Sequence, residues 1–224
     1  QTEMVAGLAK RAEKIRARLV KPQTDNMLKV TNDGRQLALD QRLIDPMLPD
    51  DPNSKVNACV DNIYRIWEEH ADTKAAQLVF SDLSTPKNDG TFNIYDDIRE
   101  KLIARGIPAE QVRFIHEANT DAQKKELFAK VRGGEVRVLL GSTPKMGAGT
   151  NVQDRLIAIH NCDCPWRPSD LEQRLGRLER QGNMFPEVEV YRYVTEQTFD
   201  AYLFQLVEGK QKFISQIMTS KSPV

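Results

Sequence analysis

From residue 75 onward, short apolar runs alternate with segments long enough to be helices. The expected strands are 78–80, 112–115, 136–140, 156–160 and 188–194, and the expected helices are 94–105, 121–131, 169–180 (capped by Ser169) and 199–218. Strands separated by helices of this length are joined by crossover connections, which give parallel pairing. The sequence therefore predicts an α/β fold with a mainly parallel sheet flanked by helices.

The segment before residue 75 does not follow this alternation. Residues 3–20 have apolar positions at helical spacing, and Ser54 is the predicted N-cap of a helix that reaches about His70. Between these helices, Asp33-Gly34 separates two short apolar runs, which predicts a β-hairpin over 27–39. We therefore expect residues 1–74 to form an accessory helix–hairpin–helix segment packed on a lobe that comprises residues 75–224.

Charge and cysteine content exclude some classes of protein. Lys plus Arg and Asp plus Glu both number 32, which argues against a purely electrostatic nucleic-acid binder but not against a local basic site. The three cysteines and the lack of a secretory segment favour a reduced, cytoplasmic setting. No apolar run approaches the ~20 residues of a membrane helix. Because the chain begins at Gln1, we expect it to be part of a longer protein.

Isolated cysteines and histidines give little evidence of a site. Cys162 and Cys164 could hold a metal, but no second ligand pair follows at zinc-site spacing, so small buried residues at a strand end are the favoured interpretation. His70, His116 and His160 are isolated in sequence, which favours surface or core roles over catalysis. No metal site is predicted in this chain.

A glycine-containing segment directly follows the expected strand 136–140. Gly147 and Gly149 would let the backbone approach a ligand closely, at the edge of the sheet where α/β proteins bind ligands. Thr143, Thr150 and Asn151 add small hydrogen-bonding groups beside that backbone. The alternative is a tight turn without a ligand.

An arginine-rich helix is expected soon afterwards. Gln173, Arg177 and Arg180 share one face of it. Three leucines with the same spacing face the other way: Leu171, Leu175 and Leu178. Arginine suits a developing negative charge on a phosphoryl group because its planar fork donates two hydrogen bonds and stays charged. The alternative is a solvated basic face with ordinary Glu–Arg pairs.

Taken together, the two segments resemble motifs V and VI of superfamily 2 helicases. The order is S-T-x-x-x-G-x-G-T-N at 142–151, a strand, Pro-Trp-Arg-Pro at 165–168 and Q-R-x-G-R-x-x-R-Q-G at 173–182. Residues 164–171 look like the D-x-x-W-N-P-x-x-D-L junction of Swi/Snf-type DNA translocases, and residues 77–81 are similar to motif IV. The opening segment, at 25–28 and 33–35, looks like the inter-lobe region of helicase–methylase proteins of phages and mobile elements.

This resemblance implies the second RecA-like lobe of an ATP-dependent DNA helicase or translocase. Arg180 would be the arginine finger that reaches the γ-phosphate of ATP, with Arg177 beside it and Gln173 helping to place both. The nucleotide-side residues would be Gly147, Gly149 and Thr150. The residues along the nucleic-acid backbone would be Thr143, Asn151 and Ser81.

The chain departs from a complete motor because it lacks the phosphate-binding lobe. It has no G-x-x-x-x-G-K-[ST] and no D-E-x-[DH] sequence after a strand. The resemblance thus implies that ATP with Mg²⁺ is bound mainly by a first RecA-like lobe of the same parent polypeptide, and that this chain alone does not hydrolyse ATP. The expected partners are that lobe and DNA, double-stranded in the favoured reading, with no membrane.

Other functions stay open at this point. The same fold could serve an RNA helicase, although the Pro-Trp-Arg-Pro junction favours DNA. A degenerate lobe could be a non-catalytic module that binds nucleic acid or protein, but retention of both Arg177 and Arg180 speaks against degeneration. An unrelated nucleotide-binding α/β domain would not explain the motif VI sequence.

Overall fold

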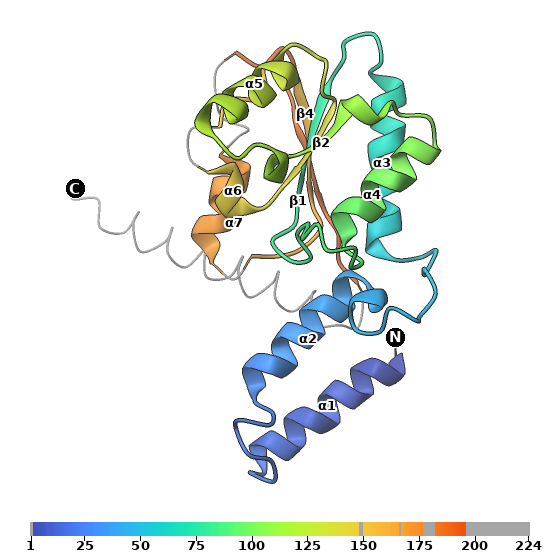
Figure 1. The fold of residues 1–224 in the computed structure, drawn as a ribbon, viewed down its shortest axis with the longest axis vertical. Coiled ribbons are helices and arrows are strands. Elements are labelled where there is room, and N and C mark those ends of the chain that lie inside the picture. The colour runs from blue at the N-terminus through green and yellow to red at the C-terminus, as the bar shows by residue number, and fades with distance from the viewer. Residues whose placement is uncertain (1, 148–149, 166, 177–181, 196–224) are drawn as a thin grey trace, which may run out of the picture.

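A parallel five-stranded sheet forms the centre of the computed structural model, which describes residues 2–147, 150–165, 167–176 and 182–195 (Figure 1). The strands follow the order β2-β3-β1-β4-β5, and every neighbouring pair is parallel. Their bounds are β1 Ala76–Phe80, β2 Val112–Phe114, β3 Val138–Gly141, β4 Leu156–Asn161 and β5 Glu189–Arg192. The predicted α/β fold with a parallel sheet is confirmed.

Helices cover both faces of this sheet (Figure 1). On one face lie α3 Lys55–Glu69 and α4 Ile94–Ala104, and on the other α5 Asp121–Arg132, α6 Thr143–Met146 and α7 Pro168–Leu175. Short 3₁₀ turns complete the described elements: η1 Gln41–Leu43, η2 Ala109–Gln111, η3 Ile115–Glu117 and η4 Gln153–Arg155. Among the described residues, no helix has the length and apolar character needed to cross a bilayer.

The core consists of two apolar layers, one on each face. Val79, Val138 and Leu140 pack with α3 and α4, whereas Leu78 and Leu139 pack with α5 and α6. Neighbouring residues face opposite sides because side chains alternate along a strand. Strands buried on both sides are apolar at most positions, which explains why apolar runs within β1, β3 and β4 were recognisable.

Of the two predicted helix caps, Ser54 is confirmed and Ser169 is not. The Ser54 hydroxyl accepts a hydrogen bond from the backbone N–H of Asn57 at 3.1 Å, and α3 ends at the C-cap His70. The predicted cap at Ser169 is wrong. Helix α7 begins one residue earlier, at Pro168, whose fixed φ suits the first helical position and whose missing N–H needs no partner there. The rest of this predicted helix (177–180) and the predicted helix 199–218 lie outside the described residues.

The predicted β-hairpin over 27–39 is also wrong. These residues form a helix, α2 Met27–Leu39, which packs antiparallel to α1 Thr2–Arg16 (Figure 1). Asn26 caps α2 by accepting from the N–H of Lys29. Val30, Gly34 and Leu37 are buried at helical spacing, so packing against α1 outweighs the roughly 1 kcal/mol cost of a glycine inside a helix. Asp33-Gly34 is therefore not a turn.

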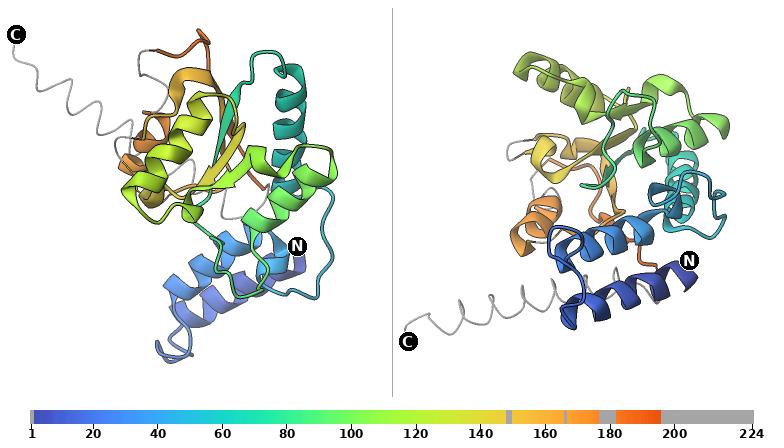
Figure 2. Two further views of the ribbon diagram at one scale, coloured as in Figure 1. Left: turned by 45° about the horizontal axis from the view of Figure 1, so that its top comes forward. Right: turned by 60° about the horizontal axis from the view of Figure 1, so that its bottom comes forward.

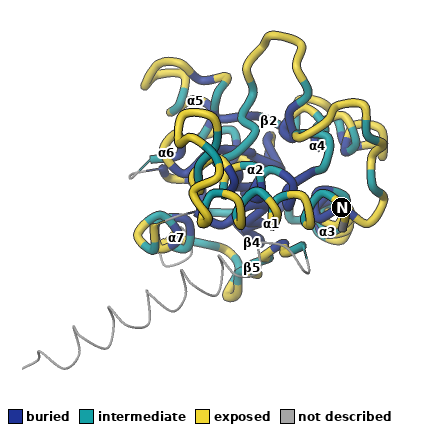
Figure 3. The backbone as a smooth tube through the Cα atoms, turned by 90° about the horizontal axis from the view of Figure 1, so that it is seen from below, coloured by how far each residue is buried: buried dark blue, intermediate teal, exposed yellow. Residues whose placement is uncertain are grey.

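The α1–α2 pair lies beside the carboxyl ends of the strands and projects away from the lobe (Figures 1 and 2). Two hydrogen bonds connect α2 to the lobe: Arg35 Nη2 to the carbonyl oxygen of Cys164 at 2.9 Å, and Thr195 Oγ1 to that of Ala38 at 2.6 Å. Residues 3–16 are all exposed or half-buried, in contrast to the buried strand β4 (Figure 3). The pair is thus an appendage attached through α2.

Candidate functional site

Polar residues gather where the three central strands end. In the register of the sheet, Phe80 of β1 lies beside Gly141 of β3 and Asn161 of β4. The residues that follow these ends, Asp82, Thr143 and Asp163, are therefore brought together although they are distant in sequence. This is the edge at which parallel α/β sheets bind ligands.

Arg174 of α7 connects all three strand ends. Its side chain is completely buried. Its guanidinium donates to Thr143 Oγ1 at 2.8 Å, Asn161 Oδ1 at 3.2 Å, and the carbonyl and carboxylate oxygens of Asp163 at 2.8 and 2.9 Å. It also forms an ion pair with Asp82 at 3.0 Å. We call Arg174, Asp82, Asp163 and Thr143 the strand-end cluster.

The charges in this cluster compensate one another. Burial alone would raise the pKa of Asp163, but the charge of Arg174 and the backbone N–H of Leu83 hold that pKa below its usual value. Burial acts to lower the pKa of Arg174, but the two carboxylates outweigh it and raise that pKa. Both groups therefore stay ionised near neutral pH. A buried charge of this kind is tolerated only when paired and hydrogen-bonded, as it is here.

Thr143 and Ser81, predicted to lie along the nucleic-acid backbone, have different surroundings. The Thr143 backbone N–H and hydroxyl donate to the two carboxylate oxygens of Asp82, at 2.7 and 3.1 Å, so Thr143 belongs to the strand-end cluster. The Ser81 side chain is buried, and its hydroxyl donates to the carbonyl oxygen of Leu83 at 2.7 Å. Ser81 thus shapes the loop after β1 and does not present its hydroxyl at the surface.

The glycine-containing segment after β3 forms a tight connection. Gly147 ends α6 with φ of 62° and ψ of 172°, a backbone conformation open almost only to glycine. The buried Thr150 hydroxyl donates back to the carbonyl oxygen of Met146, which closes the segment on itself. Asn151 is exposed, and its carbonyl oxygen accepts from Arg132 Nη1 at 2.7 Å. Gly149 lies outside the described residues.

Of the three residues predicted to act in catalysis, only Gln173 of α7 lies in the described part of the chain. Gln173 is half-buried there, directly before Arg174, and Leu171 faces the core as predicted. The other two, Arg177 and Arg180, lie outside the described residues. The structure therefore fixes the point from which the chain enters residues 177–181, and Arg174 is what holds that point to the sheet.

Sequence reasoning missed Arg174 and its two aspartates. The predicted site used the helix face that carries Gln173, whereas Arg174 is buried on the same side of α7 as Leu171. A usable signal was present: Asp82 and Asp163 each follow a buried strand by two residues. Acidic residues at the same edge of one sheet require a cation among them, and an arginine on an otherwise leucine-lined helix face is the obvious supplier.

The cysteines lie in the core. Cys162 and Cys164 are buried at the end of β4 as predicted, and Cys162 Sγ is 3.6 Å from Cys59 Sγ of α3. Among the residues that the structure describes, no three His, Cys, Asp or Glu side chains are placed to hold a metal ion.

Comparison with known proteins identifies a matching family and similar structures. The family model "Helicase conserved C-terminal domain" matches residues 55–182. YqhH of Bacillus subtilis (strain 168), named an uncharacterized ATP-dependent helicase, is 32% identical over 95 residues, which are 42% of this chain and 16% of that protein. This chain thus spans only a small part of that relative.

One solved structure supports the fold, and a second is similar only to a lesser degree. The C-terminal part of the Fun30 ATPase domain gives a TM-score of 0.53 at 18% identity, covering 75% of this chain and 50% of that one. The helicase domain of Pyrococcus furiosus Hef gives a TM-score of 0.47 at 18% identity, covering 91% of this chain and 38% of that one. At such identities the likeness concerns the fold alone.

Proposed function

This chain belongs to the helicase conserved C-terminal domain family, and from that premise we propose that it is the second motor lobe of an ATP-dependent DNA helicase or translocase. The name of YqhH as an ATP-dependent helicase supports the use of ATP. The Pro-Trp-Arg-Pro sequence at 165–168, similar to the junction of Swi/Snf-type translocases, supports DNA, double-stranded in the first instance. A first RecA-like lobe of the same parent polypeptide would bind ATP together with Mg²⁺.

One observation carries the catalytic part of the proposal: the strand-end cluster anchors α7. Arg174 joins this helix to the ends of three strands through buried hydrogen bonds and ion pairs. An arginine finger works only if its guanidinium is held where negative charge develops, because a preorganised charge needs no reorganisation during the reaction. In the proposal Arg180 is that finger, Arg177 supports it and Gln173 helps to place them.

In the proposal, Thr143 couples nucleic-acid binding to helix α7. This residue links the loop after β3 to Arg174 and Asp82, so a phosphate contact near it would reach the base of α7. Asn151 is exposed and free to meet a backbone phosphate, whereas Ser81 acts through the shape of its loop. Gly147, Gly149 and Thr150 lie in the proposed nucleotide cleft. Contacts with phosphates are independent of sequence, as a translocating motor requires.

The test is DNA-stimulated ATP hydrolysis by the complete helicase, wild type against Arg180→Ala. Loss of an arginine finger lowers turnover by roughly 10³–10⁵-fold in other NTPases, so we expect a collapse of turnover with nucleotide binding largely kept. Arg105→Ala is the matched control, because Arg105 is an exposed arginine at the end of α4. Its turnover should equal that of the wild type.

Unchanged turnover in Arg180→Ala would mean that the motif VI assignment is wrong. A complete protein that hydrolyses no ATP with either nucleic acid would favour the binding-module alternative. Stimulation by RNA and not by duplex DNA would replace the DNA assignment by the RNA helicase alternative while keeping the motor lobe.

A further inference from the structure

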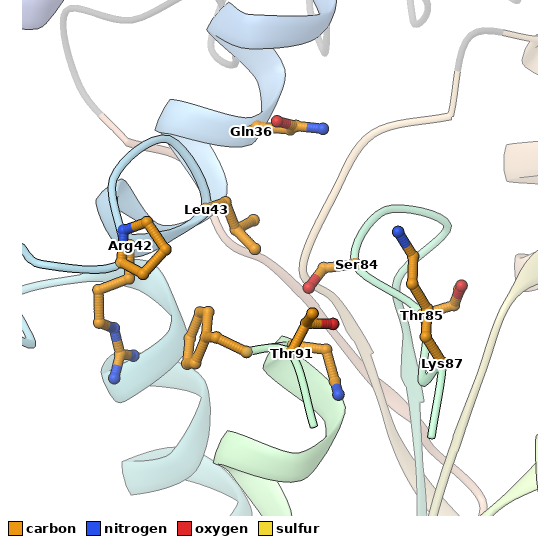
Figure 4. Close-up of a pocket in the computed structure, with 10 residues that line it drawn as sticks. Gln36, Arg42, Leu43, Ser84, Thr85, Lys87 and Thr91 are labelled. Carbon is orange, nitrogen blue, oxygen red and sulfur yellow. The ribbon is translucent and has the colours of Figure 1, made fainter. Parts of the chain in front are cut away.

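A pocket of about 330 Å³ lies between the α1–α2 pair and the lobe (Figure 4). One wall comes from α2 and η1, with Gln36 and Leu43, and the other from the loop that leaves β1, with Ser84, Thr85 and Lys87. This volume is at the lower end of the range for small-molecule sites. The strand-end cluster uses none of these residues, so the pocket is a separate feature at the same edge of the sheet.

The loop wall is held in an unusual conformation. Among the described residues only four other than glycine have a positive φ, and Ser84 and Asn88, both at 56°, are two of them. Such backbone costs free energy and persists where the surroundings impose it, often at ligand sites. Here the Ser84 hydroxyl accepts from the N–H of Ile94 at 3.0 Å, which ties the loop to the start of α4. The wall is thus formed before any ligand arrives.

The opposite wall is equally rigid. Arg42 forms ion pairs with Asp40 at 2.7 Å and with Asp97 at 3.0 Å, and its guanidinium lies 4.3 Å from the ring centroid of Phe92. Its charge is therefore compensated and its position fixed. With Leu43 and Pro46, Phe92 supplies the apolar part of the pocket lining. Because Arg42 is already paired with two carboxylates, it supports the wall of the pocket, and an anion would be bound by another residue.

The groups that remain available are few and of distinct kinds. Lys87 is exposed at the rim and forms no ion pair with any described residue. The Gln36 side-chain amide and the Thr85 hydroxyl have no hydrogen-bond partner among the residues that the structure describes. An ammonium group, an amide and an apolar wall within one small pocket match a phosphate, a base edge and a base face, which together make up a nucleotide.

We infer that this pocket takes one unpaired nucleotide of a DNA strand, with Lys87 on the phosphate and Gln36 on the base edge. The inference rests on the proposed function and adds to its duplex contact a site for an unpaired strand. A base paired and stacked in a duplex cannot enter such a pocket, because its edge and faces are covered. A free nucleotide offers the same groups, but the loop that directly continues β1 past Ser81 places the pocket on the proposed nucleic-acid side.

The test is fluorescence anisotropy with the full chain and two probes, a fluorescein-labelled oligo-dT and a blunt duplex of equal length. Gln36→Leu should weaken oligo-dT binding roughly fivefold or more and leave duplex binding unchanged. Lys87→Ala should also reduce the salt dependence for oligo-dT, by about 0.7 in the slope of log Kd against log salt. The matched control is Lys125→Ala, an exposed lysine of α5 on the other side of the lobe, which should behave as wild type.

Each other outcome has a definite meaning. Oligo-dT binding that is equal in wild type, Gln36→Leu and Lys87→Ala, or absent in wild type, overturns the pocket inference, while the turnover of Arg180→Ala still decides the motor lobe separately. Equal losses in Lys87→Ala and Lys125→Ala mean unspecific attraction and also overturn it. Thymidine monophosphate binding is measured in the same proteins. If the pocket substitutions weaken the binding of thymidine monophosphate but not that of oligo-dT, the ligand is a free nucleotide and the strand assignment fails.

Discussion

Arg174 and Arg11 each bridge a pair of aspartates, and the two arginines differ in burial. Arg174 joins Asp163 and Asp82 at the strand ends with its side chain fully buried. Arg11 of α1 joins Asp25 and Asp33 at 2.8 and 2.6 Å, but its side chain is 36% exposed. The ion-pair distances are similar, at 2.9 and 3.0 Å for Arg174. The two bridges therefore differ mainly in burial and in the further hydrogen bonds that Arg174 donates to Thr143 and Asn161.

Burial makes the inner bridge indispensable and the outer one replaceable. Arg174 and Asp163 are buried, so a carboxylate of Asp163 left without its cation is costly. Around Arg11 water can solvate each charge, and ionic screening weakens the attraction. The lobe thus depends on every member of its charge cluster, while the α1–α2 pair depends mainly on apolar packing. We expect the lobe to respond to substitutions globally and the pair to respond locally.

The largest effect is expected from Arg174→Met. It leaves Asp163 buried without its cation and should lower the free energy of unfolding by about 3–5 kcal/mol. Urea unfolding followed by tryptophan fluorescence measures this, because both tryptophans, Trp67 and Trp166, lie outside residues 1–54, which contain no aromatic residue. If the single variant does not fold, Arg174→Met with Asp163→Asn should recover part of the loss. A cost below about 1 kcal/mol would show that burial is not what matters.

A second large effect concerns the buried His160 of β4. Its Nδ1 lies 2.8 Å from the Tyr193 hydroxyl and its Nε2 lies 2.7 Å from Gln77 Oε1. Gln77 Nε2 donates to the carbonyl oxygen of Ile63, so Gln77 Oε1 faces His160 and accepts from it. The Nε2 atom of His160 therefore carries the proton of the neutral ring. The neutral ring is thus satisfied at both nitrogens. Burial, with a smaller contribution from the charge of Arg65, lowers the pKa of His160 to about 3.

The sign of the pH dependence follows from that pKa. Below pH 6.5 the unfolded chain takes up a proton on His160 and the folded chain does not, so stability falls as pH falls from 6.5 towards 3. The loss is up to about 1.4 kcal/mol per pH unit. Urea unfolding at pH 6.5 and at about pH 5 should show it for wild type, and less of it for His160→Gln, which cannot take up a proton. Equal slopes for the two proteins would contradict the assignment. Between pH 6.5 and about pH 5 Asp25 should not contribute, because Arg11 keeps its pKa below the usual value and its carboxylate stays ionised throughout that window.

Glycine-to-alanine substitutions should change the stability of the lobe and of the α1–α2 pair in opposite directions. A Cβ at Gly141, where β3 ends, would lie 2.8 Å from Met146 Cγ and 2.9 Å from Ile115 Cγ2, so Gly141→Ala should cost about 1–3 kcal/mol. At Gly7, inside α1, a Cβ would meet nothing within 4 Å. Gly7→Ala should stabilise α1, by up to about 1 kcal/mol. Thermal unfolding by circular dichroism tests both, and the same sign for both would contradict the proposed difference in packing.

The same division explains what the sequence could predict. The strands were recognisable because β1, β3 and β4 each contain a short apolar run, Leu78–Phe80, Val138–Leu140 and Leu156–Ile159, and α3 because Ser54 caps it. These signals are local. Helix α2 was mistaken for a hairpin because Asp33-Gly34 is a local turn signal, whereas the packing of Gly34 against α1 is not local. Arg174 was missed because the sheet register alone brings Asp82 to it.

The smallest effect is expected from Arg11→Met, the outer counterpart of Arg174→Met. Solvent and salt already weaken the Arg11 bridge, so the unfolding midpoint reported by tryptophan fluorescence should not move. Amide exchange in α1 and α2 should accelerate by no more than about fivefold, and the difference should vanish in about 1 M salt. Exchange in β1 and β4 serves as the internal control, since no contact of Arg11 reaches them among the described residues. A shift of the global midpoint in Arg11→Met would mean that the α1–α2 pair and the lobe unfold as one unit. The difference between the two bridges would then reflect their position in that unit and not their burial.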